Sequence, residues 1–175
     1  MGKIQRAPRP EDAKLYPAGK LLLSFLNRQG EGEIISVDMN SGVSRYPFMI
    51  GFGVPVALRP IYLPLLARKG FGLNVPDASM AEIVAKCEAL HGTPGDKFKA
   101  LGLTARRALK IETVLIDECP VVMELRFRHY WPVGECDFIV GELIMAHTDA
   151  DVLERKRTIE WYQTPLLRNV EAKHV

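Results

Sequence analysis

A polar segment and an isolated arginine are the residues whose types could do chemistry in this sequence. Residues 40–44, NSGVS, directly follow a predicted strand and offer hydroxyl, amide and backbone N–H donors close together. Such a group of donors can form a nest for an anion. Arg59 is the single charge within the apolar stretch 46–67, where an unpaired charge is costly. A guanidinium fork matches the geometry of a phosphate, so the two features together suggest an anionic ligand.

Each of these features also has a purely structural reading. Asn, Ser and Gly are common turn residues, so residues 40–44 equally suit a plain loop. Arg59 equally suits a salt bridge, or a side chain that reaches solvent along its apolar stem. Lys97, within GDKFKALGL, is compatible with an ordinary solvated lysine. From the residues alone, these alternatives stay open.

The sequence lacks the common motifs for nucleotide cradles, nucleophiles and metals. There is no G-x-G-x-x-G after a strand, no P-loop lysine motif and no G-x-S-x-G elbow. Cys87 and His91 are one helical turn apart, but Cys87 falls on an apolar face, where a free cysteine is usually a small buried hydrophobe. His129 and His147 fall at opposite ends of a predicted hairpin. We therefore expect no metal site and no catalytic side-chain constellation.

Composition excludes several other classes of protein. The net charge is +2 and the basic excess lies in the first twenty residues, so no basic stripe for nucleic acid is expected on the body. Three cysteines without a CxxC pair favour a cytoplasmic protein without disulfides. The start of the sequence has no apolar signal core. Four prolines in 46–67 argue against a membrane helix there, and this apolar region instead suggests a subunit interface.

Hydrophobic patterning predicts strands first, then a helical layer, then a long hairpin. Strands are expected at 21–26, 34–39, 47–52, 71–76, 123–130 and 138–147, and helices at 60–69, 79–91 and 96–100. Ser79 and Glu82 suggest a capping box at the start of the second helix. Alternation from Met123 to Tyr130 is typical of a half-buried antiparallel strand.

This order of elements predicts an α+β fold that is mainly antiparallel β, with a barrel core and a few peripheral helices. We expect an extended arm at residues 1–20 and one domain over residues 21–175. The segment after residue 153 is expected to be helical or irregular and to dock on a partner.

Four stretches resemble the flavin reductase-like, FMN-binding split-barrel family, which includes flavoredoxin-like proteins. They are similar to family motifs in the same order and at similar spacing: DMNSGVSRYP (38–47), KGFGLNVP (69–76), GDKFKALGLT (95–104) and GECDFIVGELIMAHTDADVL (134–153). Each motif is soft alone, and their joint order makes the resemblance specific. The resemblance implies a split β-barrel of Greek-key type and a homodimer with one FMN per subunit near the interface.

The resemblance also implies a function and a set of flavin contacts. It implies an NAD(P)H-dependent flavin reductase-type oxidoreductase, in which hydride passes from the nicotinamide to the flavin and the cofactor does the hard chemistry. Arg59 matches an arginine that approaches the FMN phosphate, and Lys97 falls in a segment near the flavin. The full set of implied cofactor-binding residues is Met39, Asn40, Ser41, Gly42, Val43, Ser44, Arg59 and Lys97.

Three departures from the family pattern keep two rival functions open. Met39 stands where the family often has an aromatic residue, Ile61 where a phosphate-binding Ser or Thr is usual, and Cys136 where G-D-H has histidine. One rival is a flavoredoxin-like electron carrier that takes electrons from a protein partner. The other is a divergent split-barrel protein that keeps the fold without the catalysis.

Overall fold

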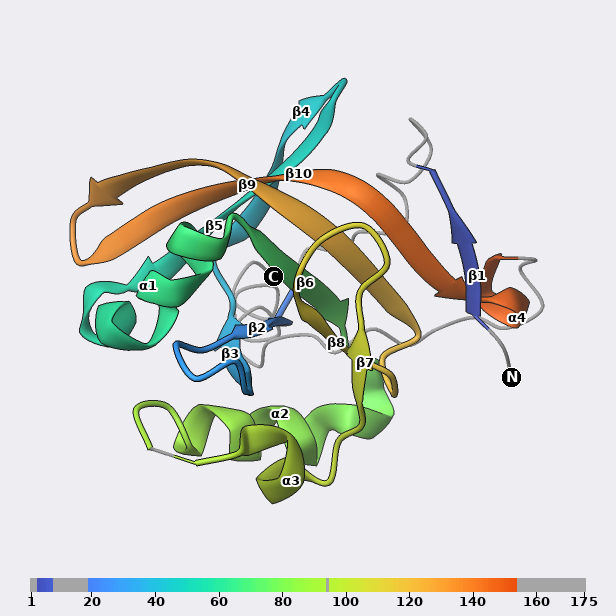
Figure 1. The fold of residues 1–175 in the computed structure, drawn as a ribbon, viewed down its shortest axis with the longest axis horizontal. Helices are drawn as coiled ribbons and strands as arrows, with labels where there is room; N and C mark the ends of the chain where they lie inside the picture. The colour runs from blue at the N-terminus through green and yellow to red at the C-terminus, as the bar shows by residue number, and fades with distance from the viewer. Residues whose placement is uncertain (1–2, 8–18, 94, 154–175) are drawn as a thin grey trace, which may run out of the picture.

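An eight-stranded antiparallel sheet forms the centre of the computed structural model, which describes residues 3–7, 19–93 and 95–153 (Figure 1). The sheet path is β3-β2-β6-β9-β10-β5-β4, and β1 pairs with β10. The strands of this sheet are β1 (Lys3–Arg6), β2 (Leu21–Leu26), β3 (Gly32–Val37), β4 (Asn40–Arg45), β5 (Phe48–Pro55), β6 (Gly70–Val75), β9 (Val121–Val133) and β10 (Cys136–Asp149). A separate pair is formed by β7 (Ala105–Arg107) and β8 (Val114–Ile116). The predicted mainly antiparallel fold is confirmed.

The apolar core lies on both faces of the central strands. In β2, Leu21 and Leu23 pack into the cluster inside the barrel, whereas Leu22 packs against the helical layer. A strand covered on both faces reads as a continuous apolar run, and this explains the sequence LLLSFL. The same holds for the first half of β9, where Val122 faces the helical layer and Met123 faces the barrel interior.

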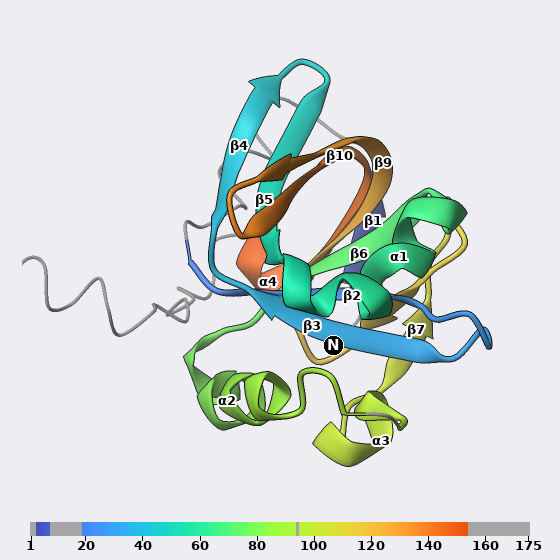
Figure 2. The same cartoon turned by 90° about the vertical axis from the view of Figure 1, so that its left-hand side faces the viewer.

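The helices begin and end largely where the helix-starting and helix-breaking residues of the sequence predict. Helix α1 (Arg59–Arg68) has a proline in its first turn and ends at Lys69. Helix α2 (Ala81–Ala89) buries Val84 and Cys87 against the sheet, and α3 (Lys97–Leu101) lies beside it (Figure 2). A short helix, α4 (Ala150–Leu153), follows β10.

Three local predictions are wrong, each for a tertiary reason. Residues 40–44 are not a loop but part of β4. Asn, Ser and Gly have a weak intrinsic preference for strands, and hydrogen bonds to β5 stabilise the strand here. The capping box is absent, since Ser79 donates to the carboxylate of Asp77, which caps the preceding 3-10 turn. Finally, β9 is not half-buried throughout, because the helical layer covers its first half on the second face.

Some expectations concern residues that the structure does not describe. Of the expected arm at 1–20, residues 3–6 join the sheet as β1, while residues 8–18 lie outside the described range. The segment from residue 154 onward, expected to dock on a partner, also lies outside it. No helix within the described ranges is long and apolar enough to cross a membrane.

Candidate functional site

A strip of backbone without side chains runs along the outward face of β5. The neighbouring Phe52 and Val54 point into the barrel core, so the alternating Gly51 and Gly53 face outward. A Cβ atom on Gly51 would lie 2.4 Å from the ring of Phe138, and one on Gly53 would lie 2.5 Å from the terminal methyl of Met39. The side chains of neighbouring segments therefore lie directly over the bare backbone of β5.

Three of these covering side chains, Met39, Val43 and the half-buried Phe138, form an apolar surface with the neighbouring Trp131, here called the platform. Met39 is 53% exposed and Val43 is 47% exposed. The rings of Trp131 and Phe138 lie with centroids 5.1 Å apart and planes tilted by 45°. A contiguous exposed apolar surface on a folded protein usually marks a binding site for a ligand or another chain.

The predicted polar residues all lie on β4, next to the platform. The Asn40 amide donates to the carbonyl of Gly19 at 2.6 Å, so this side chain fixes the entry to the strand. Ser41 and Gly42 are exposed, and Ser44 is half-buried. Among the described strands, β4 lies at one end of the sheet path, so the backbone groups on its outer edge face outward. The structure thus brings Met39 to Ser44 together.

Arg59 forms an ion pair with Asp137, so the salt bridge that was one of its predicted structural roles is present. Its Nε lies 2.8 Å from Asp137 Oδ2 and its Nη2 lies 2.8 Å from Asp137 Oδ1. The hydroxyl of Tyr62 also donates to the buried Asp137 carboxylate. The hydrogen bond from Arg59 holds the pKa of Asp137 below its usual value, against the opposing effect of burial. A role of Arg59 at a phosphate stays a prediction, with Nη1 left for it.

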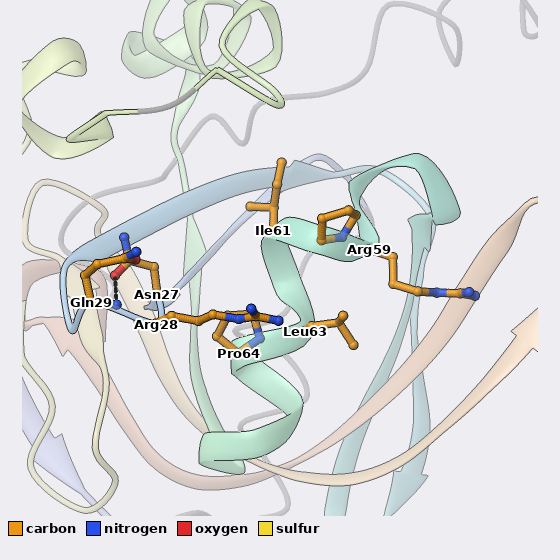
Figure 3. A pocket seen from close by; sticks show the side chains of 8 residues that line it. Asn27, Arg28, Gln29, Arg59, Ile61, Leu63 and Pro64 are labelled. Atoms are coloured by element: carbon orange, nitrogen blue, oxygen red, sulfur yellow. Dashed lines mark hydrogen bonds between the residues drawn. The ribbon is translucent and has the colours of Figure 1, made fainter.

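A pocket of about 420 Å³ lies at the first turns of α1, and Arg59 lines it together with Arg28 (Figure 3). Arg28 comes from the turn between β2 and β3 and forms no ion pair with another described residue. In Figure 3 the Arg59 side chain extends away from Arg28, toward the strands that carry Asp137. Ile61 lines the same pocket without a hydroxyl. Arg28 is not among the predicted site residues, because an arginine in a polar turn carries no distinguishing signal in the sequence.

Lys97 does not join these residues within one chain. It is buried, where its ammonium contacts the Glu33 carboxylate and lies 3.4 Å from the carbonyl oxygen of Ile34. The reading of Lys97 as a solvated lysine is therefore wrong. Its helix, α3, lies on the opposite side of β3 from the protruding β4–β5 hairpin (Figure 2).

The residues weighed as metal ligands have ordinary structural environments. Cys87 is buried in the core as predicted, and burial raises the pKa of its thiol to about 12. His91 Nε2 accepts from the backbone N–H of Ser36 at 3.1 Å. His129 is exposed and His147 is buried. Within the described ranges, no three His, Cys, Asp or Glu side chains lie close enough to hold a metal.

With this geometry in place, the comparisons with known proteins decide the family. Residues 14–168 match the flavin reductase like domain. The chain belongs to the flavin reductase-like family. A comparison with curated protein sequences gives no match.

Solved structures agree with this flavin reductase-like fold. The FMN-binding protein from Thermus thermophilus, solved with bound p-hydroxybenzaldehyde, matches with a TM-score of 0.72 and 17% identity over 91% of this chain and 89% of that one. Flavoredoxin of Desulfovibrio vulgaris (Miyazaki F) matches with a TM-score of 0.69 and 20% identity, covering 78% of this chain and 72% of that one. A Shewanella frigidimarina protein described as a putative flavin reductase with a split barrel domain matches with a TM-score of 0.71 and 16% identity, covering 82% and 73%. The predicted split-barrel fold is confirmed.

Proposed function

We propose that this chain binds FMN and acts as an NAD(P)H-dependent oxidoreductase of the flavin reductase type. The observation that carries the proposal is the apolar platform over Gly51 and Gly53, in a chain of the flavin reductase-like family. A flat aromatic ring binds against an apolar surface, and the platform supplies one. The polar edge strand β4 adjoins it and offers backbone hydrogen-bonding groups to the rim of a ring.

The phosphate end of FMN fits the pocket at the first turns of α1. Arg28 and Arg59 both line that pocket, and the Arg59 side chain extends from it toward Asp137. The α1 N-terminus has no side-chain cap, and the positive end of its dipole favours an anion, although the Arg59 N–H donates to Val56 O and Pro60 has no N–H to offer. Because Asp137 already neutralises much of Arg59, we assign the larger share of phosphate binding to Arg28.

These positions assign separate roles to the cofactor and to the residues around it. When bound, FMN supplies the hydride-accepting ring that passes electrons from a reduced nicotinamide to an acceptor. Met39, Val43 and Phe138 exclude water from one face of the ring, and the edge of β4 orients it. Asp137 holds the Arg59 guanidinium in one orientation through two hydrogen bonds. No side-chain acid or base is required, in agreement with the lack of such a constellation in the sequence.

We further propose that the chain works as a cytoplasmic homodimer. The hairpins β4–β5 and β9–β10 extend from the body (Figures 1 and 2) and carry exposed Tyr46, Trp131 and Val133 near their tips. A second copy is the simplest partner for this apolar surface. Within 46–67, six apolar side chains are buried in the core, so only the exposed part of that region, such as Tyr46, is available for an interface. The cytoplasmic location rests on three unpaired cysteines.

A visible absorption spectrum of the purified protein, before and after addition of FMN, tests the function. We expect a flavin spectrum that NADH or NADPH bleaches under anaerobic conditions. A protein that stays colourless and binds no added FMN in calorimetry, while circular dichroism shows a normal fold, would overturn the proposal in favour of a non-catalytic split barrel. Tight FMN binding with negligible NAD(P)H oxidation would instead support an electron carrier. Light scattering separates dimer from monomer.

A further inference from the structure

A second cavity, of about 510 Å³, is lined mainly by cations. Arg68 and Lys69 come from the C-terminal end of α1, Arg126 and Arg128 from β9, and Lys110 from the segment between β7 and β8 (Figure 1). Ile111 and Phe127 provide an apolar wall, and Glu112 is the single carboxylate in the lining. The pocket proposed for the FMN phosphate shares none of these residues, because it lies at the N-terminal turns of α1.

The carboxylates near this cavity leave much of its charge uncompensated. Arg68 pairs with Glu112 at 2.9 Å, and Arg128 pairs with Glu142. Glu142 also lies opposite Arg126 in the strand register, but its carboxylate is bound by Arg128. The other three cations, Lys69, Lys110 and Arg126, form no ion pair with any described residue. Like charges gathered around one cavity repel one another unless an anion lies between them.

The backbone at Lys69 supplies a second, independent observation. Lys69 ends α1 with φ of 57°, in the left-handed region that lysine rarely adopts. Glycine is the usual residue at this position after a helix, because it takes this conformation without a steric cost. Strained residues of this kind are concentrated at active sites and ligand-binding sites. The chain therefore keeps a lysine at a strained position that also lines the cavity.

A buried hydrogen-bond network fixes the opposite wall of the cavity. The Glu124 carboxylate accepts from the backbone N–H groups of Leu109, Lys110 and Ile111 at 2.8, 2.7 and 3.2 Å. His147 Nε2 lies 2.7 Å from Glu124 Oε1, and both side chains are fully buried. The segment that carries Lys110 is thus anchored to β9 rather than free to move away from the other cations. A binding site requires preorganised groups of this kind.

We propose that this cavity binds a phosphate-bearing anion with two or more negative charges. Three unpaired cations from three different elements surround it, while Ile111 and Phe127 suit a small apolar portion of the same ligand. The inference goes beyond the proposed flavin chemistry, since it concerns a separate pocket at the other end of α1 and holds whether or not FMN binds.

Calorimetric titration of the full chain with inorganic pyrophosphate tests the proposal. We expect saturable binding that weakens as sodium chloride is raised, because salt screens charges at a solvent-accessible site. The affinity for pyrophosphate should not change when the titration is repeated with excess FMN. No detectable binding at low salt, or competition with FMN for one site, would overturn the assignment. The titration needs no flavin, so its result is independent of the outcome for the proposed function.

Lys69→Gly separates binding from folding. Glycine relieves the left-handed strain, so the melting temperature should rise or stay unchanged, while pyrophosphate affinity should fall by about tenfold, the typical value of one hydrogen bond to a charged group. Arg126→Ala should cause a similar loss. Lys99→Ala, which removes an exposed cation from α3, is the matched control and should leave the affinity as it is. Equal affinities for all three variants and the parent protein would refute the site.

Competition then distinguishes two sources of the phosphate. Displacement of pyrophosphate by ADP or NADPH would support binding at this cavity and assign the phosphate to a nucleotide. A failure of both to displace it, with the variant pattern above intact, would support the cavity as a site for a smaller phosphorylated compound.

Discussion

Asp137 holds the guanidinium of Arg59 with both carboxylate oxygens, at 2.8 Å each, while the Tyr62 hydroxyl donates to the same carboxylate. The two partners differ in exposure: the Asp137 side chain is fully buried, whereas the Arg59 side chain is 38% exposed. This pair links the first turn of α1 to β10, and through β10 to the platform that we propose for the flavin ring.

The difference in exposure predicts unequal effects of two substitutions. Arg59→Gln leaves a buried carboxylate without its cation, so it should destabilise the protein strongly. Asp137→Asn leaves an arginine that can turn toward solvent, so its cost should be smaller. Urea denaturation of both variants at neutral pH checks the order of the two midpoints. An equal loss in both variants would contradict the predicted asymmetry, and midpoints equal to that of the parent protein would mean that the ion pair contributes little to stability.

The same pair predicts a pH dependence with a definite sign. The pKa of Asp137 is lowered in the folded state, whereas an unfolded Asp titrates at about 3.9. The pair therefore stabilises the fold fully above that value, and this stabilisation is lost as pH falls through the folded-state pKa. The difference in free energy of unfolding between the parent protein and Asp137→Asn should be largest near neutral pH and shrink in acid. A difference that grows in acid would contradict the assignment.

Glu124 should be the most sensitive carboxylate in the fold. Burial opposes its ionisation, but the hydrogen bonds from His147 and from the backbone of Leu109 and Lys110 outweigh burial and lower its pKa. Glu124→Gln places an amide against N–H donors, and the loss of a buried charged acceptor costs about 3 kcal/mol. Thermal and urea melts measure this loss. Glu82→Gln, at an exposed pair on α2, is the control and should leave the melting midpoint unchanged.

Two glycines allow a matched test of the platform. A Cβ on Gly51 would collide with the Phe138 ring at 2.4 Å on the outer face, and one on Gly141 would collide with the Phe71 ring at 2.5 Å inside the barrel. Gly51→Ala should weaken FMN binding and change Trp131 fluorescence, because the Phe138 ring lies against Trp131. Gly141→Ala should instead destabilise the core by about 1–3 kcal/mol, as overpacking does. The reverse pattern would place the ring site elsewhere.

Local signals in the sequence predict the elements that depend on local chemistry. Pro60 in the first turn predicts where α1 begins, and Gly70 after Lys69 predicts where it ends. The apolar run at 21–26 predicts β2. The order of strands and helices predicts the antiparallel barrel. The fold class therefore follows from patterns that act within a few residues of one another.

Long-range pairing determines the features that the sequence could not predict. The residues of β4 have weak strand propensity, and β4 exists because β5 pairs with it. Glu124 occupies a position that alternation assigns to solvent, yet segment 109–111 and His147 bury it. The platform depends on side chains from three segments converging over Gly51 and Gly53, and neither glycine carries a motif.

Arg28 provides the final prediction, because its proposed partner is the phosphate that distinguishes FMN from riboflavin. Arg28→Ala should weaken FMN binding by about tenfold, since a hydrogen bond from a charged group is worth about 1.5–3 kcal/mol. Riboflavin has no phosphate, so its affinity should be the same for the variant and the parent protein. Fluorescence quenching titrations with both flavins measure the two affinities under identical conditions. An equal loss for the two flavins would mean that the substitution disturbs the ring site or the fold, whereas no loss for either would remove Arg28 from the flavin pocket and leave the phosphate to Arg59 and the α1 N-terminus.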